Sequence, residues 1–219
     1  NRYVAIKILA PHLASSGAAR KRFAREVQAA AAVVDDHVLP IHSVDQWQGI
    51  PYFVMQYSRG VTLQKRIQDQ GPLELKEILR IGMQAAKGLA AAHAQGLIHR
   101  DVKPSNILLD GAVERVLLSD FGLARAIDDV GLTHTGTAAG TPQYMSPEQV
   151  RGGNVDARSD LFALGCVLYA MCTARPPFRA ANSYAVMRQI TDEEPRPIRE
   201  VNPEIPEWLC QLIARLMAK

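Results

Sequence analysis

The stretch "LIHRDVKPSNILLD", residues 97–110, holds the densest group of chemically useful side chains in the sequence. Asp101, Lys103 and Asn106 fall within six positions, in a loop that leaves a long predicted helix and enters a predicted strand. A carboxylate within reach of a cation and an amide suits the activation of a hydroxyl beside a metal and a polyphosphate. Taken alone, an Asp or Asn in a loop more often caps a turn.

A second carboxylate follows in "LLSDFGLAR", residues 117–125. Asp120 comes nineteen residues after Asp101, at the end of a predicted strand and two residues before a glycine. A carboxylate at a strand end, followed by a flexible glycine, suits a metal ligand. We therefore expect Asp120 to act together with the loop of residues 97–110.

The chain begins with a strand pattern and continues with a helix pattern. In "NRYVAIKILA" (residues 1–10) the side chains alternate, so Lys7 shares one face of the predicted strand with Ala5. An amphipathic helix predicted over residues 18–33 places Glu26 on its inward face. A strand-end lysine and a solvated helix glutamate are the structural alternatives.

The remaining pattern is mostly helical after the first quarter of the chain. Residues 122–141 are rich in Gly, Thr and Ala and weak in periodicity, which predicts a long functional loop. The other predicted elements are strands at 39–47 and 51–57 with a turn at Gly49, a connector at 58–60, short strands near 106–110 and 116–120, and helices at 72–96, 156–173, 181–191 and 205–219.

Composition excludes several classes of function. The 219 residues are 47% hydrophobic and 21% charged, which is typical of a globular protein. The net charge of +3 is too small to predict a nucleic-acid partner. The longest apolar run, residues 161–174, is too short to span a bilayer, so we expect no membrane segment within the chain. The three cysteines lack a metal-ligand spacing and are expected to be buried free thiols.

Four motifs occur in the order and spacing of the protein kinase signature set. They are "VAIK" (4–7), "HRDVKPSN" (99–106), "DFG" (120–122) and "GTPQYMSPE" (140–148). The chain therefore resembles the bacterial, eukaryotic-like (Hanks-type) serine/threonine protein kinases over essentially its whole length. The resemblance implies an α+β, two-lobed fold, with a small β-rich lobe over residues 1–57 that lacks its first two strands and a larger helical lobe over residues 58–219.

The resemblance also implies catalytic roles for the motif residues. Asp101 would orient the acceptor hydroxyl and accept its proton, and Lys103 would steady the γ-phosphate. Lys7 would hold the α- and β-phosphates and form an ion pair with Glu26. Asn106 is the fifth residue to which the resemblance assigns a catalytic role.

ATP and Mg²⁺ are the cofactors that the resemblance implies. Asn106 and Asp120 would hold the metal ion. The implied nucleotide-binding residues are Ala5 and Leu108 on either side of the adenine, Met55 as gatekeeper, the backbones of Gln56 and Ser58 in the hinge, and Lys7 and Asp120 at the phosphates. The aliphatic members of this group are equally compatible with ordinary core packing.

The loop before residue 142 carries the implied regulatory positions. "GTPQY" and the lysine two residues after Asp101 resemble the serine/threonine subgroup, in which Thr141 would bridge toward that aspartate. We predict autophosphorylation at Thr135 or Thr137, with simple loop polarity as the alternative. The residues concerned are Thr133, Thr135 and Thr137, with Arg100 and Arg125 as cations for a phosphate.

Two parts of the family pattern are not found in this sequence. No G-x-G-x-x-G precedes "VAIK", and the sequence stops at "LIARLMAK" (212–219), before the arginine that the family pairs with the glutamate at position 148. We therefore expect a kinase domain truncated at both ends, whose open sheet edge favours self-association.

Asp160 is expected both to begin a helix and to anchor the backbone near His99 and Arg100.

The sequence thus predicts ATP-dependent phosphorylation of serine and threonine hydroxyls on protein substrates. The expected location is the cytoplasm, either as a separate protein or as the cytosolic domain of a larger membrane-anchored one. One alternative is a catalytically impaired, kinase-like scaffold that binds nucleotide or a partner without transfer. Another is a small-molecule phosphotransferase, which "GTPQYMSPE" disfavours because it resembles a peptide-docking platform.

Overall fold

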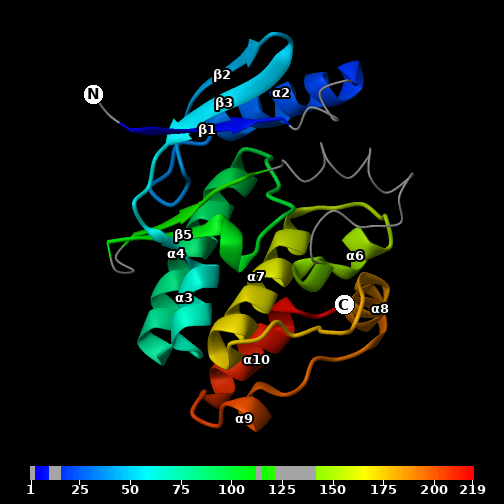
Figure 1. Ribbon diagram of the computed structural model, residues 1–219. Helices are drawn as coiled ribbons and strands as arrows, with labels where there is room; N and C mark the ends of the chain where they lie inside the picture. Colours follow the sequence, from blue (N-terminus) through cyan, green and yellow to red (C-terminus); the bar gives the residue numbers. More distant parts are fainter. Residues whose placement is uncertain (1–2, 10–15, 112–114, 122–141) are drawn as a thin grey trace.

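The computed structural model describes residues 3–9, 16–111, 115–121 and 142–219. A small antiparallel sheet with one helix lies at one end of the molecule, and a larger helical region lies below it (Figure 1). This arrangement confirms the predicted α+β, two-lobed fold. The boundary between residues 57 and 58 stays a prediction.

The small lobe is built on three strands in the order β1-β3-β2. They are β1 (Val4–Ile8), β2 (Ile41–Trp47) and β3 (Ile50–Gln56), and both pairs are antiparallel. The predicted turn at Gly49 joins β2 to β3, and its φ of +78° is the left-handed backbone that glycine adopts most easily.

Helix α2 (Gly17–Ala31) covers one face of this sheet. It begins after Ser16, whose side chain accepts a hydrogen bond from the Ala19 amide and so caps the first turn. A small hydrophobic cluster joins the helix to the sheet, and its buried members are Leu9, Phe23, Val27 and Phe53.

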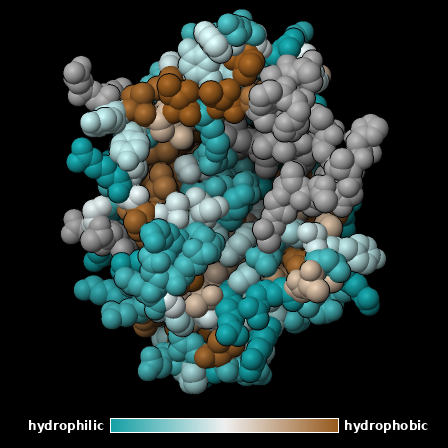
Figure 2. All heavy atoms as spheres, in the orientation of Figure 1, coloured by the Kyte–Doolittle hydropathy of each residue, from teal (hydrophilic) through white to brown (hydrophobic). Residues whose placement is uncertain are grey.

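The other face of β1 carries apolar side chains that are open to solvent. Val4, Ile6 and Ile8 are 40%, 59% and 63% exposed, and they lie along the edge strand of the sheet. Figure 2 shows this hydrophobic strip across the upper part of the molecule.

The large lobe begins with a second sheet, in the order β4-β5-β6. The strands β4 (Val61–Thr62), β5 (Ile107–Asp110) and β6 (Arg115–Leu118) are antiparallel, and helix α3 (Leu63–Gln70) follows β4 directly. A side chain at Gly60 would place its Cβ 2.1 Å from the Leu109 carbonyl oxygen. Only glycine therefore allows the segment after β3 to approach β5 so closely.

Two long helices form the centre of the large lobe, α4 (Leu75–Ala94) and α7 (Ala157–Thr173). Helix α4 begins three residues later than predicted, because Glu74, its N-cap, has an extended backbone with a ψ of 146°. The Leu73 amide before it donates to the Met171 carbonyl at 2.9 Å. Asp156 caps α7, which is buried from Phe162 to Thr173, as expected for a core helix.

The remaining helices surround α7, and the chain ends on α10 beside it (Figure 1). Cys166 and Cys172 are buried as expected, but Cys210 is partly exposed because it lies at a lobe surface rather than inside the core. No helix of the described residues is long and apolar enough to cross a membrane. The elements are α6 (Pro147–Val150), α8 (Ser183–Asp192), α9 (Ile198–Val201) and α10 (Glu207–Leu216), with 3₁₀ turns η1 (Pro104–Asn106) and η2 (Pro142–Tyr144).

Candidate active site

The loop between α4 and β5 is fixed by one buried carboxylate. Asp160, in the first turn of α7, is 1% exposed, and it accepts hydrogen bonds from the amides of His99 (2.8 Å) and Arg100 (2.7 Å). Arg100 has a φ of +66°, a left-handed conformation that costs a side-chain-bearing residue about 1–2 kcal/mol. Two hydrogen bonds to a charged group offset this cost. The anchoring role predicted for Asp160 is confirmed.

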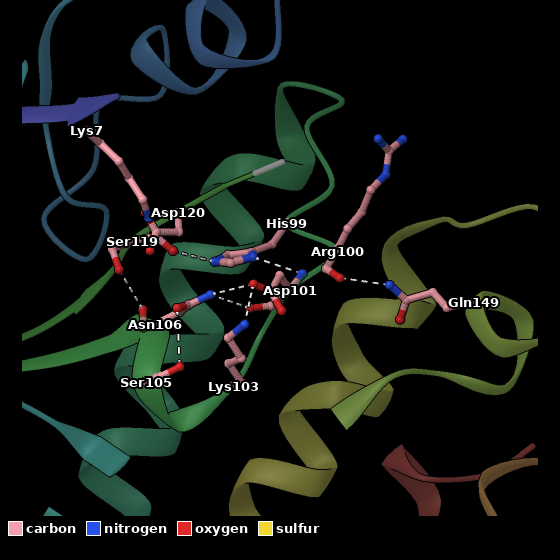
Figure 3. Close-up of polar contacts among 10 residues, drawn as sticks. All are labelled: Lys7, His99, Arg100, Asp101, Lys103, Ser105, Asn106, Ser119, Asp120 and Gln149. Atoms are coloured by element: carbon pink, nitrogen blue, oxygen red, sulfur yellow. Dashed lines mark hydrogen bonds and ion pairs between the residues drawn. The ribbon is translucent and has the colours of Figure 1, made fainter. Parts of the chain in front are cut away.

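The next residue, Asp101, has one carboxylate oxygen held in place (Figure 3). Lys103 Nζ lies 2.7 Å from its Oδ2, and Asn106 Nδ2 donates to the same oxygen at 2.9 Å. Asn106 also donates to the Asp101 carbonyl at 2.9 Å, which closes the loop on itself. Every side-chain contact that the described residues make with this carboxylate falls on Oδ2, so Oδ1 has no side-chain partner among them.

The buried imidazole of His99 links this loop to the strand that follows. Its Nδ1 accepts from the Asp101 amide (3.3 Å), so the proton sits on Nε2, which donates to the Ser119 carbonyl (2.9 Å). Burial lowers the pKa of His99, in agreement with a neutral ring. The ring also packs on Phe121, with 4.3 Å between centroids. His99 therefore positions both chain segments without carrying a charge.

Asn106 and Asp120 are brought together through Ser119. The Ser119 amide and hydroxyl both donate to the Asn106 carbonyl, at 2.9 and 3.2 Å. An amide oxygen and a carboxylate are the hard oxygen donors that Mg²⁺ prefers, usually with the rest of its shell from phosphates and water. The described residues hold no group of three His, Cys, Asp or Glu side chains that suits a metal ion.

Lys7 and Glu26 do not form the predicted ion pair in this structure. Lys7 Nζ lies 2.6 Å from Asp120 Oδ1, whereas Glu26 Oε1 lies 3.9 Å from a guanidinium nitrogen of Arg100. The physical reason is reach. The Arg100 side chain extends from the loop to Glu26 of α2, and the Lys7 side chain extends from β1 down to Asp120 (Figure 3). Each cation thus binds a carboxylate of the opposite lobe.

The side chains expected around an adenine lie at the junction of the lobes. Ala5 and Met55 are direct partners across the β1–β3 pair, and Leu108 lies in β5 of the other lobe. The Gln56 amide donates to the Pro40 carbonyl at 2.9 Å, so that amide is committed within the protein. Ser58 accepts a hydrogen bond from the Gly60 amide through its hydroxyl, which shapes the turn after β3.

Comparison with known proteins identifies this arrangement. All 219 residues match the family model described as the protein kinase domain. The chain belongs to this family. The family predicted from the four motifs is confirmed.

Mycobacterial kinases are among the most similar proteins. The serine/threonine-protein kinases PknB and PknD of Mycobacterium tuberculosis are 40% and 39% identical to the chain, over 225 and 220 residues. Each match covers 100% of this chain but only 36% and 33% of the relative, so the chain spans about a third of the length of these curated relatives. The solved PknI kinase domain of M. tuberculosis superposes with a TM-score of 0.78 at 28% identity, over 98% of this chain and 76% of that one.

Part of the expected regulatory region of the kinase domain lies outside the described residues. This holds for Thr133, Thr135, Thr137 and Thr141, and for Arg125. Arg100, the other residue expected to meet a phosphate, is described and lies close to Glu26.

Sequence reasoning missed a glutamine that supports the catalytic loop from the far side. Gln149 Nε2 donates to the Arg100 carbonyl at 2.8 Å, and Gln149 is itself held in a capping box with Ser146. The spacing S-x-x-Q at residues 146–149 is a visible capping signal and would have located this residue on a helix start. Glu148, beside it, accepts a hydrogen bond from the Ser159 hydroxyl.

Proposed function

We propose that this chain transfers the γ-phosphoryl group of ATP to serine and threonine hydroxyls of protein substrates. The observation that carries the proposal is the Asp101 carboxylate, which is held through Oδ2 by Lys103 and Asn106, while Oδ1 has no side-chain partner among the described residues. The names of the similar curated kinases PknB and PknD support the serine/threonine class of acceptor.

In the proposed reaction, the acceptor hydroxyl lies against Asp101 Oδ1, which orients it and takes its proton. The hydroxyl oxygen bonds to the γ-phosphorus as the bond to the bridging oxygen breaks, and ADP leaves with that oxygen. Lys103 is close enough to Asp101 to neutralise charge on the transferring group. Mg²⁺ supplies charge neutralisation at the phosphates, and we assign Asp120 and Asn106 as its protein ligands.

The nucleotide side of the site must rearrange during binding. Asp120 Oδ1 is engaged by Lys7 at 2.6 Å, so a metal ligand and a phosphate anchor are bound to each other. We infer that Lys7 moves from Asp120 to the α- and β-phosphates, and that Glu26 leaves Arg100 to support Lys7 there. Ala5, Met55, Gln56, Ser58 and Leu108 are proposed to hold the adenine.

Further parts of the proposal concern regulation, location and partners. Autophosphorylation at Thr135 or Thr137, and a bridge from Thr141 to the catalytic loop, are proposed from the sequence motif. Mass spectrometry after incubation with ATP should find phosphate between residues 131 and 141. A cytosolic location is proposed because ATP is supplied there. Self-association stays a prediction, which the exposed apolar side of β1 supports.

The deciding experiment compares Asp101→Asn with Asp69→Asn, whose carboxylate is exposed on α3 and pairs with Lys65. Labelled ATP, Mg²⁺ and peptides with serine, threonine or tyrosine acceptors are the substrates. We expect the wild-type chain and Asp69→Asn to label serine and threonine peptides, and Asp101→Asn to lose about a thousandfold in rate. Nucleotide binding without any transfer would favour the scaffold. Labelling of small alcohols but not peptides would favour a small-molecule phosphotransferase.

A further inference from the structure

Gln149, in the short helix α6, joins the segment before that helix to the catalytic loop. Its Nε2 donates to the Arg100 carbonyl at 2.8 Å (Figure 3). Its Oε1 accepts from the Ser146 amide at 2.9 Å. A backbone N–H only donates and a backbone carbonyl only accepts, so the two contacts fix which end of the glutamine amide faces which segment. One side chain therefore holds together two backbone segments that are distant in the sequence.

The carbonyl that Gln149 contacts belongs to the peptide group between Arg100 and Asp101. The N–H of the same peptide group, on Asp101, donates to Nδ1 of His99 at 3.3 Å. A peptide group is planar, so a donor at its oxygen and an acceptor at its N–H together set the direction of the whole plane. That plane leads directly into Asp101, and its direction determines where the carboxylate of the proposed base points.

The backbone of Arg100 requires support, because it is left-handed. Its φ of +66° is a conformation that residues with a side chain rarely adopt. Such a conformation persists only where the surroundings hold it firmly. Helix α7 holds the Arg100 amide, and Gln149 holds the Arg100 carbonyl. Loss of the glutamine donor would leave that carbonyl to turn toward another donor, and the plane that leads into Asp101 would turn with it.

Gln149 is itself held in place by the start of α6. Its backbone amide donates to the Ser146 hydroxyl at 3.4 Å, which completes a capping box, and Ser146 is fully buried. The neighbouring Glu148 accepts a hydrogen bond from the Ser159 hydroxyl of α7, and its carbonyl accepts from the Gly153 amide at 2.8 Å. The donor is thus presented to the catalytic loop by a helix that is tied to the core helix α7.

We propose that Gln149 is a positioning residue, which sets the direction of Asp101 by holding the Arg100–Asp101 peptide group. The kinetic part of this inference rests on the proposed function. Its structural part concerns only the backbone around residue 101 and depends on no activity.

The test separates the donor of Gln149 from the cap that the same side chain provides. Gln149→Glu keeps an oxygen for the Ser146 amide, since glutamate serves in capping boxes as glutamine does, but it removes the N–H that faces Arg100. Gln149→Met removes both interactions. Gln68→Glu, at an exposed position on α3, is the matched control.

Amide hydrogen exchange, followed residue by residue by NMR near pH 7, gives the first readout. We expect Gln149→Glu to speed exchange of the Asp101 amide about tenfold, because the loss of one hydrogen bond makes this peptide group easier to open. The Ser146 amide should stay within about twofold of wild type, because its acceptor is kept. In Gln149→Met both amides should exchange faster, and in Gln68→Glu neither should change.

Kinetics provide the second readout. We expect both Gln149 variants to lower kcat about tenfold near pH 8 with KM for ATP unchanged, since a misplaced catalytic group acts on the chemical step. As the pH falls toward about 6, the introduced carboxyl of Gln149→Glu gains a proton and donates to the Arg100 carbonyl again, so its kcat should approach the wild-type value at the same pH. Gln149→Met has no proton to gain, and its deficit should not change with pH. If the wild-type chain transfers no phosphate, the proposed function fails, and exchange of the Asp101 amide still decides the role of Gln149.

Three outcomes would overturn the inference. The first is wild-type exchange of the Asp101 amide in Gln149→Glu. The second is a deficit in kcat of Gln149→Glu that stays the same at lower pH, which would indicate lost packing and not a lost donor. Should Gln149→Glu not fold, Gln149→Met replaces it in the exchange measurement at Asp101. Failure of both variants to fold would assign the glutamine to stability and is the third.

Discussion

The two sides of the site are held by different kinds of interaction. On the side of the large lobe, the catalytic loop is held by short hydrogen bonds that involve buried groups, such as the carboxylate of Asp160 and the neutral ring of His99. On the side of the small lobe, Lys7 projects from an edge strand and is 43% exposed at its side chain. The proposed base is therefore held in place before any substrate binds, whereas the proposed phosphate anchor, Lys7, can exchange one carboxylate partner for another.

The hydrophobic core of the large lobe is also more extensive than that of the small lobe. Among the described residues, the large lobe has one extended core that includes α4, α7 and the second sheet, while the small lobe has a cluster of four buried side chains. A region with fewer buried contacts opens more easily on its own. This difference suits a site in which the nucleotide side moves over a fixed catalytic loop.

The largest expected effect comes from the residue at which the two sides meet. Asp120→Asn removes the negative charge that faces Lys7 and, in the proposed function, Mg²⁺. We expect phosphoryl transfer to fall about a thousandfold, because neutralisation of phosphate charge is worth several kcal/mol. Asp110→Asn, at the end of β5, is the matched control and should keep the wild-type rate. Equal rates in the two variants would contradict the assignment.

A smaller loss of activity is expected from a substitution of Lys7, on the small-lobe side of the site. Lys7→Met should lower kcat/KM about a hundredfold, mainly by a higher KM for ATP, since it removes one charged contact to the phosphates. Lys65→Met, whose lysine is 63% exposed on α3, should change nothing. Steady-state kinetics with varied ATP distinguish this from a loss in kcat alone, which would place Lys7 outside nucleotide binding.

The two cores can be compared with one substitution made in each. Leu89→Ala, in the extended core of the large lobe, should lower the free energy of unfolding by about 4 kcal/mol. Leu9→Ala, in the small cluster, should cost about 2 kcal/mol, because fewer neighbours surround the cavity and they can collapse into it. The leucines are 1% and 3% exposed, so burial is matched. Urea unfolding measures both, and an equal or reversed order would show that the small lobe is as tightly packed.

The sequence predicted those features that depend on local pattern or on motif spacing. The alternation around Lys7 predicted β1, and Asp101, Lys103 and Asn106 were placed correctly between a helix and a strand. The ion-pair partner of Lys7 was not predictable, because it depends on how far side chains reach between lobes. The start of α4 was missed because residues 72–74 fit the helical pattern, whereas Glu74 is extended in the structure and the Leu73 amide contacts Met171 of α7.

The smallest expected effect is a pH dependence of the free energy of unfolding, which tests how His99 supports the large-lobe side of the site. Burial lowers the pKa of His99 in the folded chain, so the unfolded chain binds a proton at a higher pH than the native one does. The resulting stability is fully present above the unfolded value of about 6.5 and is lost as the pH falls below it, by up to about 1.4 kcal/mol per pH unit. Between about pH 7 and pH 5.5, we expect the free energy of unfolding to fall more for the wild-type chain than for His99→Phe, which has no imidazole to protonate. Urea unfolding at the two pH values measures this, with the exposed His42→Gln as control. An identical loss in wild type and His99→Phe would mean that the buried ring does not hold the loop in its neutral form.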